Sequence, residues 1–133
     1  MNSILLAPLI FSLLAIPAFV PHRNPEPMEG EYVLTRFEFS SILYLKENNR
    51  FKYKYSLGGC QGSIEGQWSK EENGLKLTSE KQTQLDESDN LNPFYPLFRG
   101  HYWRVEKRGI KPEKKVDTGC FQTRGIHKKV RKG

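Results

Sequence analysis

Residues 41–57, with the sequence SILYLKENNRFKYKYSL, decide the fold class of this 133-residue chain. Every other residue is apolar in both halves of the stretch, which is the period of a β-strand with one buried face. The apolar positions are Leu43 and Leu45 in the first half, then Phe51, Tyr53, Tyr55 and Leu57 in the second. Between the halves, Glu47-Asn48-Asn49 supplies residue types that tolerate the positive φ of a tight turn. The stretch therefore predicts a β-hairpin.

The same alternation continues on both sides of this hairpin. A first strand is predicted to carry Val33, Phe37 and Phe39 on one face and charged residues on the other. After a glycine-rich turn at residues 58–62, Ile64 and Trp68 share a face, and Gly66 between them marks a bulge, a bend or a close backbone approach. Asn73-Gly74 predicts a further hairpin that leads into a strand with Leu75 and Leu77. Five short strands within residues 30–79 predict an antiparallel meander that is wetted on one side.

The rest of the chain adds connections and one more strand. Residues 80–92 have almost no apolar content and predict an exposed loop, whereas the proline-flanked stretch at residues 92–98 is expected to cap one open end of the sheet. Residues 101–108 return to strand character and are expected to close the sheet. No segment has a helical apolar stripe. The predicted fold class is therefore all-β, an antiparallel meander that forms a small or partial barrel over residues 30–121.

The spaced pattern resembles that of small secreted lipocalin-like β-proteins of the Bacteroidota type, which are largely uncharacterised. The resemblance covers residues 30–79. It rests on a G-x-Y opening strand at Gly30–Tyr32, an L-x-L and F-x-Y hairpin, and a G-x-W strand at Gly66–Trp68. A lipocalin opens with G-x-W in its first strand, whereas here that motif comes later. The resemblance implies a ligand-binding barrel and no catalytic residue.

The first twenty residues contain no charged side chain. Residues 4–20 form an apolar run that ends in small residues around Ala18, as a secretory signal peptide does. We expect a signal peptide at residues 1–18 and a polar spacer at residues 19–29. The protein would then be exported to the periplasm or the extracellular space. The alternative is an uncleaved membrane anchor at residues 4–20, although two prolines disfavour a spanning helix.

Both cysteines, Cys60 and Cys120, fall in the exported part. An isolated pair in an oxidising compartment predicts a disulfide, and two separate thiols are the alternative. The disulfide would close a loop of about sixty residues and stabilise a small domain by about 4 kcal/mol.

Sequence motifs for catalysis are missing. The three histidines, His22, His101 and His127, have no serine or cysteine beside them in a recognisable nucleophile motif. The glycine-rich turn at residues 58–62 precedes no phosphate-binding Lys-Ser/Thr and no helix. A metal site that combines His101, Cys120 and His127 would require the fold to bring them together. We expect no enzyme, no cofactor and no bound metal.

Basic residues are concentrated near the C-terminus. Residues 104–133 carry 11 Lys and Arg and 3 acidic residues, a net charge of +8, whereas the rest of the chain is at −2. We expect residues 122–133 to form a solvated basic tail. The basic patch would consist of Lys114, Lys115, Lys128, Lys129, Arg131 and Lys132. Export and the lack of interleaved aromatic residues argue against a nucleic-acid partner.

Two functional hypotheses follow. In the first, the β domain binds a small apolar ligand or a protein partner through aromatic residues that face inward or cap the sheet: Phe51, Tyr53, Tyr55, Trp68, Phe94, Tyr95 and Phe98. The alternative role for these rings is to fill the core. In the second, the basic tail contacts an anionic membrane or an acidic polysaccharide.

Overall fold

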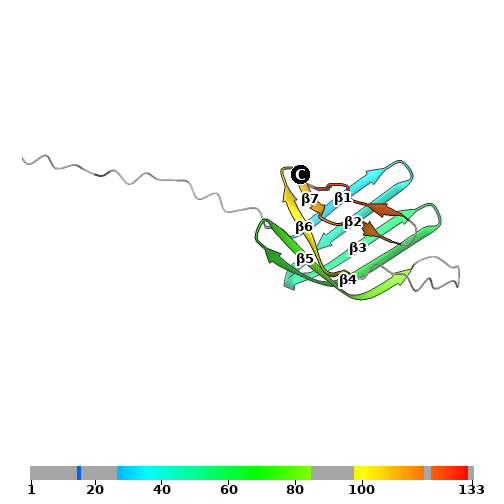
Figure 1. Ribbon diagram of the computed structural model, residues 1–133, viewed down its shortest axis with the longest axis horizontal. Coiled ribbons are helices and arrows are strands. Elements are labelled where there is room, and N and C mark those ends of the chain that lie inside the picture. Colours follow the sequence, from blue (N-terminus) through cyan, green and yellow to red (C-terminus); the bar gives the residue numbers. More distant parts are fainter. Residues whose placement is uncertain (1–14, 16–26, 85–97, 119–120, 132–133) are drawn as a thin grey trace, which may run out of the picture.

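Eight antiparallel strands close into a barrel in the order β1-β10-β7-β6-β5-β4-β3-β2 (Figure 1). The computed structural model describes residue 15 and residues 27–84, 98–118 and 121–131. The barrel strands are β1 (Gly30–Arg36), β2 (Phe39–Leu45), β3 (Arg50–Leu57), β4 (Cys60–Glu71), β5 (Gly74–Gln84), β6 (Arg99–Glu106), β7 (Gly109–Pro112) and β10 (His127–Lys129). The short strands β8 (Val116–Asp117) and β9 (Gln122–Thr123) form a separate two-stranded sheet. The predicted all-β antiparallel meander is confirmed.

Within the described ranges, the helical element is η1 (Glu47–Asn49), a single 3-10 turn. No helix in this part of the chain is long and apolar enough to cross a membrane.

The hairpin predicted from residues 41–57 is formed by β2 and β3. Leu43 pairs with Tyr53 and Leu45 pairs with Phe51, and all four side chains are buried inside the barrel. At the connecting turn, Asn48 and Asn49 have φ angles of 62° and 59°. Asparagine tolerates this left-handed region because its short polar side chain can bond locally.

The predicted inward face of the first strand is wrong. Phe37 and Glu38 form a two-residue turn between β1 and β2, with Glu38 at φ 59°, and the Phe37 side chain is 92% exposed. Tyr32 and Leu34 point inward instead, because Tyr32 pairs with the inward-facing Leu43. Side chains alternate between the two faces of a strand. The prediction assigned odd-numbered residues to the inner face of β1, whereas the even-numbered Tyr32 and Leu34 occupy it.

Strands β4 and β5 form the longest hairpin. Their register shifts between Glu65 and Gly66, which confirms the irregularity expected at this glycine. A Cβ atom at Gly66 would lie 2.0 Å from the Thr78 carbonyl oxygen, so only glycine allows this approach. β5 continues to Gln84, and the predicted loop at residues 80–92 is therefore wrong for its first five residues. Residues 85–92, and most of the predicted cap at residues 92–98, lie outside the described residues.

The structure corrects the expected basic tail at residues 122–133. The chain forms β9 and then β10, which pairs with β7 on one side and with β1 on the other. An open barrel would leave the edges of β1 and β7 unpaired, and a three-residue strand is enough to cover them. This strand is too short and too rich in lysine to show a period-two pattern.

The two ends of the barrel differ. The segment that carries β8 and β9 covers one end, where the Phe121 ring lies 4.1 Å from that of Phe39 and 5.9 Å from that of Tyr55. Val116 and Thr118 of the same segment are buried. We call this the plugged end. The opposite end, where β1 begins and β2 and β10 finish, is called the rim end.

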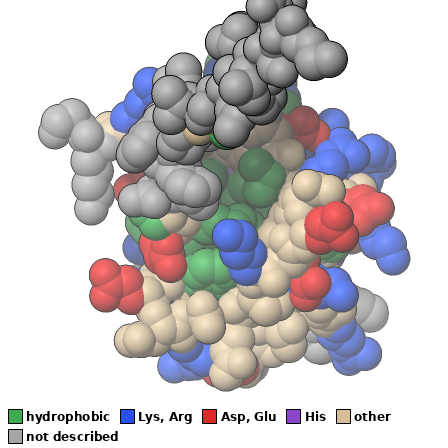
Figure 2. Space-filling view, turned by 90° about the vertical axis from the view of Figure 1, so that its left-hand side faces the viewer, with side chains coloured by type: hydrophobic (Ala, Val, Ile, Leu, Met, Phe, Trp, Pro, Cys, Tyr) green, Lys and Arg blue, Asp and Glu red, His purple; other side chains and the backbone are tan. Residues whose placement is uncertain are grey.

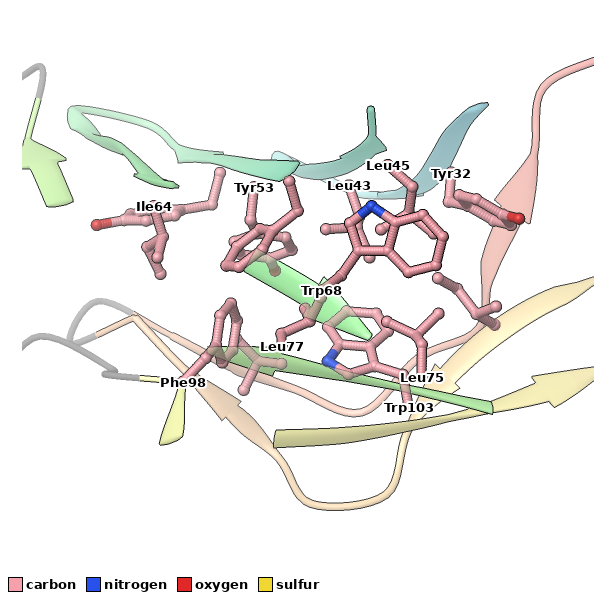
Figure 3. Packing of buried hydrophobic residues seen from close by; sticks show 14 residues of the cluster. Tyr32, Leu43, Leu45, Tyr53, Ile64, Trp68, Leu75, Leu77, Phe98 and Trp103 are labelled. Carbon is pink, nitrogen blue, oxygen red and sulfur yellow. The ribbon is translucent and has the colours of Figure 1, made fainter. Parts of the chain in front are cut away.

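Large side chains fill the barrel between its two ends. In Figure 3, side chains from opposite walls, such as Tyr53 and Trp103, point towards one another. The Tyr53 ring lies 6.2 Å from Trp103 and 5.7 Å from Phe98. The buried cluster consists of Tyr32, Leu43, Leu45, Phe51, Tyr53, Tyr55, Ile64, Trp68, Leu75, Leu77, Phe98, Trp103, Ile110 and Val116.

Candidate ligand-binding site

A cavity of about 910 Å³ opens at the rim end. It is bounded by the start of β1, the end of β2 with the following turn, and the residues that end and follow β10. Figure 2 looks onto this end of the molecule and shows hydrophobic side chains at the floor of a hollow, with charged side chains of both signs around it. The lining residues are Pro27, Glu29, Gly30, Glu31, Tyr44, Leu45, Lys46, Glu47, Lys129, Val130 and Arg131.

Hydrogen bonds hold the spacer residues against this rim. The Lys129 ammonium donates to the Pro27 carbonyl over 2.6 Å, and the Tyr32 hydroxyl donates to the Met28 carbonyl over 2.7 Å. The Val130 backbone N–H donates to the Glu31 carbonyl over 2.8 Å, which extends the pairing of β10 and β1 beyond the strand end. The cavity wall therefore joins segments from the two ends of the described chain.

The lining combines an apolar surface with charges of both signs. Pro27, Leu45 and Val130 offer apolar atoms, and Tyr44 offers an aromatic ring. Three cations and three carboxylates complete the wall: Lys46, Lys129 and Arg131 against Glu29, Glu31 and Glu47. Such a wall suits a molecule with an apolar body and a charged head group.

The predicted ligand residues lie elsewhere. Five of the predicted ligand residues are among the described residues: Phe51, Tyr53, Tyr55, Trp68 and Phe98. All five side chains are buried inside the barrel, and none of them lines the rim cavity. Phe94 and Tyr95 lie outside the described residues. One of the five, Trp68, is hydrogen-bonded to a residue of the cavity wall: its indole N–H donates to the Lys46 carbonyl over 3.1 Å. The described rings thus act as core, the alternative named for them above.

The fold brings together a pair of polar side chains that sequence patterns did not connect. The Ser41 hydroxyl lies 2.6 Å from Nε2 of His127, and Nδ1 of His127 lies 3.1 Å from the Gly125 carbonyl oxygen. Ser41 and His127 are 86 residues apart in the chain, so no local motif could have shown the contact.

Burial sets the protonation state of this pair. It lowers the pKa of His127 from 6.5 to about 4, and the hydrogen bond to the Gly125 carbonyl opposes this shift in part. The neutral ring then donates from Nδ1 to Gly125 and accepts at Nε2 from the Ser41 hydroxyl. Although a serine beside a neutral histidine has the chemistry of a nucleophile and its base, both side chains are fully buried. No solute reaches the Ser41 hydroxyl in this conformation.

Other polar atoms inside the barrel make no hydrogen bond of good geometry to any residue that the structure describes. They are the Tyr53 hydroxyl, both ring nitrogens of His101 and the indole nitrogen of Trp103. Burial raises the pKa of Tyr53 above 10, with the Ser41 hydroxyl opposing the shift, and burial lowers the pKa of His101. Both shifts favour the uncharged form of the side chain, the neutral phenol of Tyr53 and the neutral imidazole of His101, because burying a charge costs more free energy than burying the neutral group.

Of the metal site considered from His101, Cys120 and His127, the structure describes the two histidines. Both ring nitrogens of His127 are engaged in hydrogen bonds, which leaves no lone pair for a metal. Cys120 lies outside the described residues. Within residues 27–84, 98–118 and 121–131, no group of three or more His, Cys, Asp or Glu side chains could hold a metal ion.

Cys60 lies at the plugged end, partly buried against the core together with Phe121. No cysteine in the described part of the chain is a free thiol. The predicted partner, Cys120, precedes Phe121 in the sequence but is not among the described residues, so the disulfide stays a prediction.

The predicted basic patch is spread over several elements. Lys114 and Lys115 follow β7, Lys128 lies on the outside of β10, and Lys129 and Arg131 line the rim cavity. Lys132 lies outside the described residues.

Comparisons with family models, with curated proteins and with solved structures find no match for this chain. The class that the fold itself defines is an eight-stranded antiparallel β-barrel with a buried aromatic cluster.

Proposed function

We propose that this chain is an exported, non-enzymatic barrel of the lipocalin-like type that binds a small amphipathic molecule at its rim cavity. The observation that carries the proposal is the cavity itself. Its volume of about 910 Å³ falls within the range of small-molecule sites, roughly 300–1,000 Å³. A meander of eight strands closed into a barrel is a common scaffold for such sites.

The composition of the wall favours an apolar body with a charged head. An acyl or aromatic body would lie against Tyr44, Leu45 and Val130, which would remove apolar surface from water. A carboxylate or phosphate head would lie near Lys46 or Arg131, and a cationic head would lie near the glutamates. Fatty acids, alkylamines and zwitterionic lipids are therefore the ligand classes to compare.

The test uses tryptophan fluorescence, because Trp68 is hydrogen-bonded to Lys46 at the cavity wall. Purified protein without residues 1–18 is titrated with the three ligand classes and with a hydrophobic dye. We expect a saturable fluorescence change with at least one class. If none of them changes the fluorescence and none displaces the dye, the proposal is overturned.

Two exposed valines provide a matched pair of variants. Val130, 44% exposed, lines the cavity, whereas Val105, 49% exposed, does not. We expect Val130→Arg to fill part of the cavity and to weaken binding tenfold or more, whereas Val105→Arg binds as the wild type does. Equal affinity of Val130→Arg and the wild type would place the ligand elsewhere.

Export is tested separately with the full chain, including its own leader. After expression in a Gram-negative host, the cell fractions are separated and the N-terminus of the protein is determined by mass spectrometry. We expect a soluble periplasmic form that begins at Phe19. An intact N-terminus in the membrane fraction would instead support the anchor at residues 4–20.

A further inference from the structure

Among the described residues, the net charge lies in the C-terminal part of the chain. Residues 27–84, which form β1 to β5, carry eight Lys and Arg and eight Asp and Glu, a net charge of zero. Residues 98–118 and 121–131 carry eleven Lys and Arg and three Asp and Glu, a net charge of +8. Their strands β6, β7 and β10 are neighbours in the barrel. Residues that composition alone would place in a solvated tail therefore belong largely to a folded surface.

The strand register defines this surface, which we call the basic face: Arg104, Lys107, Arg108, Lys111 and Lys128. Arg104 and Lys111 point outward, because their strand neighbours Trp103 and Pro112 are buried. Lys128 points outward from β10, next to the inward-facing His127. The exposed Lys107 and Arg108 form the turn between β6 and β7.

Cations on the two sides of the barrel are paired differently. On the β3–β5 side, Arg50 lies 2.7 Å from Glu80, and Lys52 lies 3.4 Å from Glu65. On the basic face, Arg104 and Lys111 stand directly opposite each other in the register, an arrangement of like charges that destabilises a sheet. Arg104 also forms an ion pair with Glu106 over 2.8 Å, so one carboxylate partly neutralises this pair of cations. A surface that meets anions would compensate for the repulsion.

Exposed apolar side chains adjoin the same side. Three of the exposed large hydrophobic residues, Val105, Ile126 and Val130, belong to the β6–β10 region. Ile126 and Val130 flank the ends of β10, two positions before and after Lys128. A fourth, Phe37, lies at the tip of the hairpin formed by β1 and β2, at the opposite end of the barrel from the Lys107–Arg108 turn, so both meet one plane when the barrel lies on its side.

We propose that the basic face docks on a membrane surface rich in anionic lipids. The cations would contact lipid phosphates, and the Phe37 and Ile126 side chains would enter the boundary between head groups and acyl chains. The apolar residues favour a membrane over an acidic polysaccharide, which offers no apolar phase. The surface is separate from the ligand proposal, because Lys107, Arg108 and Lys111 do not line the rim cavity.

The test is flotation of the protein without residues 1–18 with vesicles of phosphatidylcholine alone or mixed with phosphatidylglycerol. We expect binding to the mixed vesicles that falls as salt rises from about 0.05 to 0.5 M, and little binding to phosphatidylcholine. The triple variant K107S/R108S/K111S should bind the mixed vesicles at least tenfold more weakly.

The matched control, K70S/K76S/K81S, removes the same charge from exposed positions on β4 and β5. It should change vesicle binding less than twofold. Circular dichroism shows whether both triple variants keep the fold. The variant F37S/I126S should weaken vesicle binding and leave retention on heparin unchanged.

Three outcomes would overturn the proposal. Equal losses in the two triple variants would show that net charge acts without a defined face. Retention on heparin without vesicle binding would assign the face to an acidic polysaccharide. Wild-type protein that floats with neither vesicle would exclude membrane docking, while ligand binding at the rim cavity would remain measurable on its own.

Discussion

His127 lies beside two lysines in the sequence, yet its ring is fully buried inside the barrel. The ring contacts Trp103 at 4.9 Å and Tyr53 at 6.1 Å, and both of its nitrogens are hydrogen-bonded. A histidine held in this way is neutral in the folded protein. Its proton balance therefore couples folding to pH.

This coupling predicts a loss of stability in mild acid. The pKa of His127 is about 4 in the folded protein and 6.5 in the unfolded chain. Between pH 4 and pH 6.5, the unfolded chain therefore binds a proton at this residue that the folded protein does not bind. The free energy of unfolding is therefore highest above pH 6.5 and falls by roughly 3 kcal/mol as the pH drops to 4. Urea unfolding at pH 7, 6, 5 and 4 measures the loss.

The variant His127→Gln removes the titrating group. It should be less stable at pH 7, because it disturbs the bond to Ser41, but its free energy of unfolding should depend less on pH in this range, with His101, whose pKa is also lowered by burial, supplying the remaining dependence. Lys128→Gln, at the exposed neighbouring position, should keep the acid dependence of the wild type. A His127→Gln protein that loses as much stability in acid as the wild type would contradict the assignment to His127.

Two buried tyrosines should respond in opposite ways to the loss of a hydroxyl. The Tyr32 hydroxyl donates to the Met28 carbonyl, so Tyr32→Phe should cost about 1 kcal/mol of unfolding free energy. The Tyr53 hydroxyl lies near the Ser41 hydroxyl but makes no hydrogen bond of good geometry to a described residue, so Tyr53→Phe should be neutral or stabilising. Urea midpoints of the two variants decide the matter. A larger loss in Tyr53→Phe than in Tyr32→Phe would show that the Tyr53 hydroxyl is bonded in solution.

At the scale of elements, the sequence predicted those strands whose local pattern was unambiguous. The hairpin of β2 and β3 has a clean alternation and a turn that its asparagines favour, so both its place and its inward face were predictable. In β1, apolar residues occur on both faces, and the two-residue turn at Phe37 and Glu38 carries no glycine or asparagine. The inward face there depends on pairing with β2, which is tertiary information.

The candidate site was less predictable than the fold. The rim cavity is lined by one or two residues each from β1, β2, η1 and β10 and by residues next to these elements, and no local spacing connects the four elements. Of the residues predicted to bind partners, Lys129 and Arg131 do line it, although they were predicted as parts of a basic tail. The aromatic residues were correctly expected to face inward, but inward positions in a barrel of eight strands are largely filled by side chains.

The plugged end provides a test at the scale of elements. Phe121 packs on Phe39 and Tyr55, and both Phe121 and Cys60 are partly buried against the core. We expect oxidised protein to show no reactive thiol after denaturation, and reduction to lower the free energy of unfolding by up to about 4 kcal/mol. The double variant C60A/C120A should be insensitive to reductant. Two reactive thiols in the unreduced, denatured protein would contradict the disulfide.

For the molecule as a whole, the short strand β10 should decide whether the barrel forms. A chain that stops after Gly125 lacks the strand that joins β1 to β7 and also lacks the buried His127. We expect it to lose cooperative thermal unfolding, because two strand edges and part of the core become exposed. A chain that stops after Arg131 should melt as the full chain does. If the shorter chain also melted normally, residues 126–133 would be the dispensable tail that composition suggested.

The contact between the last strand and the first has a consequence for the timing of folding. Lys129 reaches back over 102 residues to Pro27, and the barrel seam is made between β1, the first barrel strand along the chain, and β10, the last. Pairings so distant in sequence form slowly, and here they require β10 to be present. A nascent chain would therefore remain without its seam until β10 has been synthesised. For the export that we propose, this delay would be useful, because a chain without its seam is easier to keep unfolded for passage across a membrane.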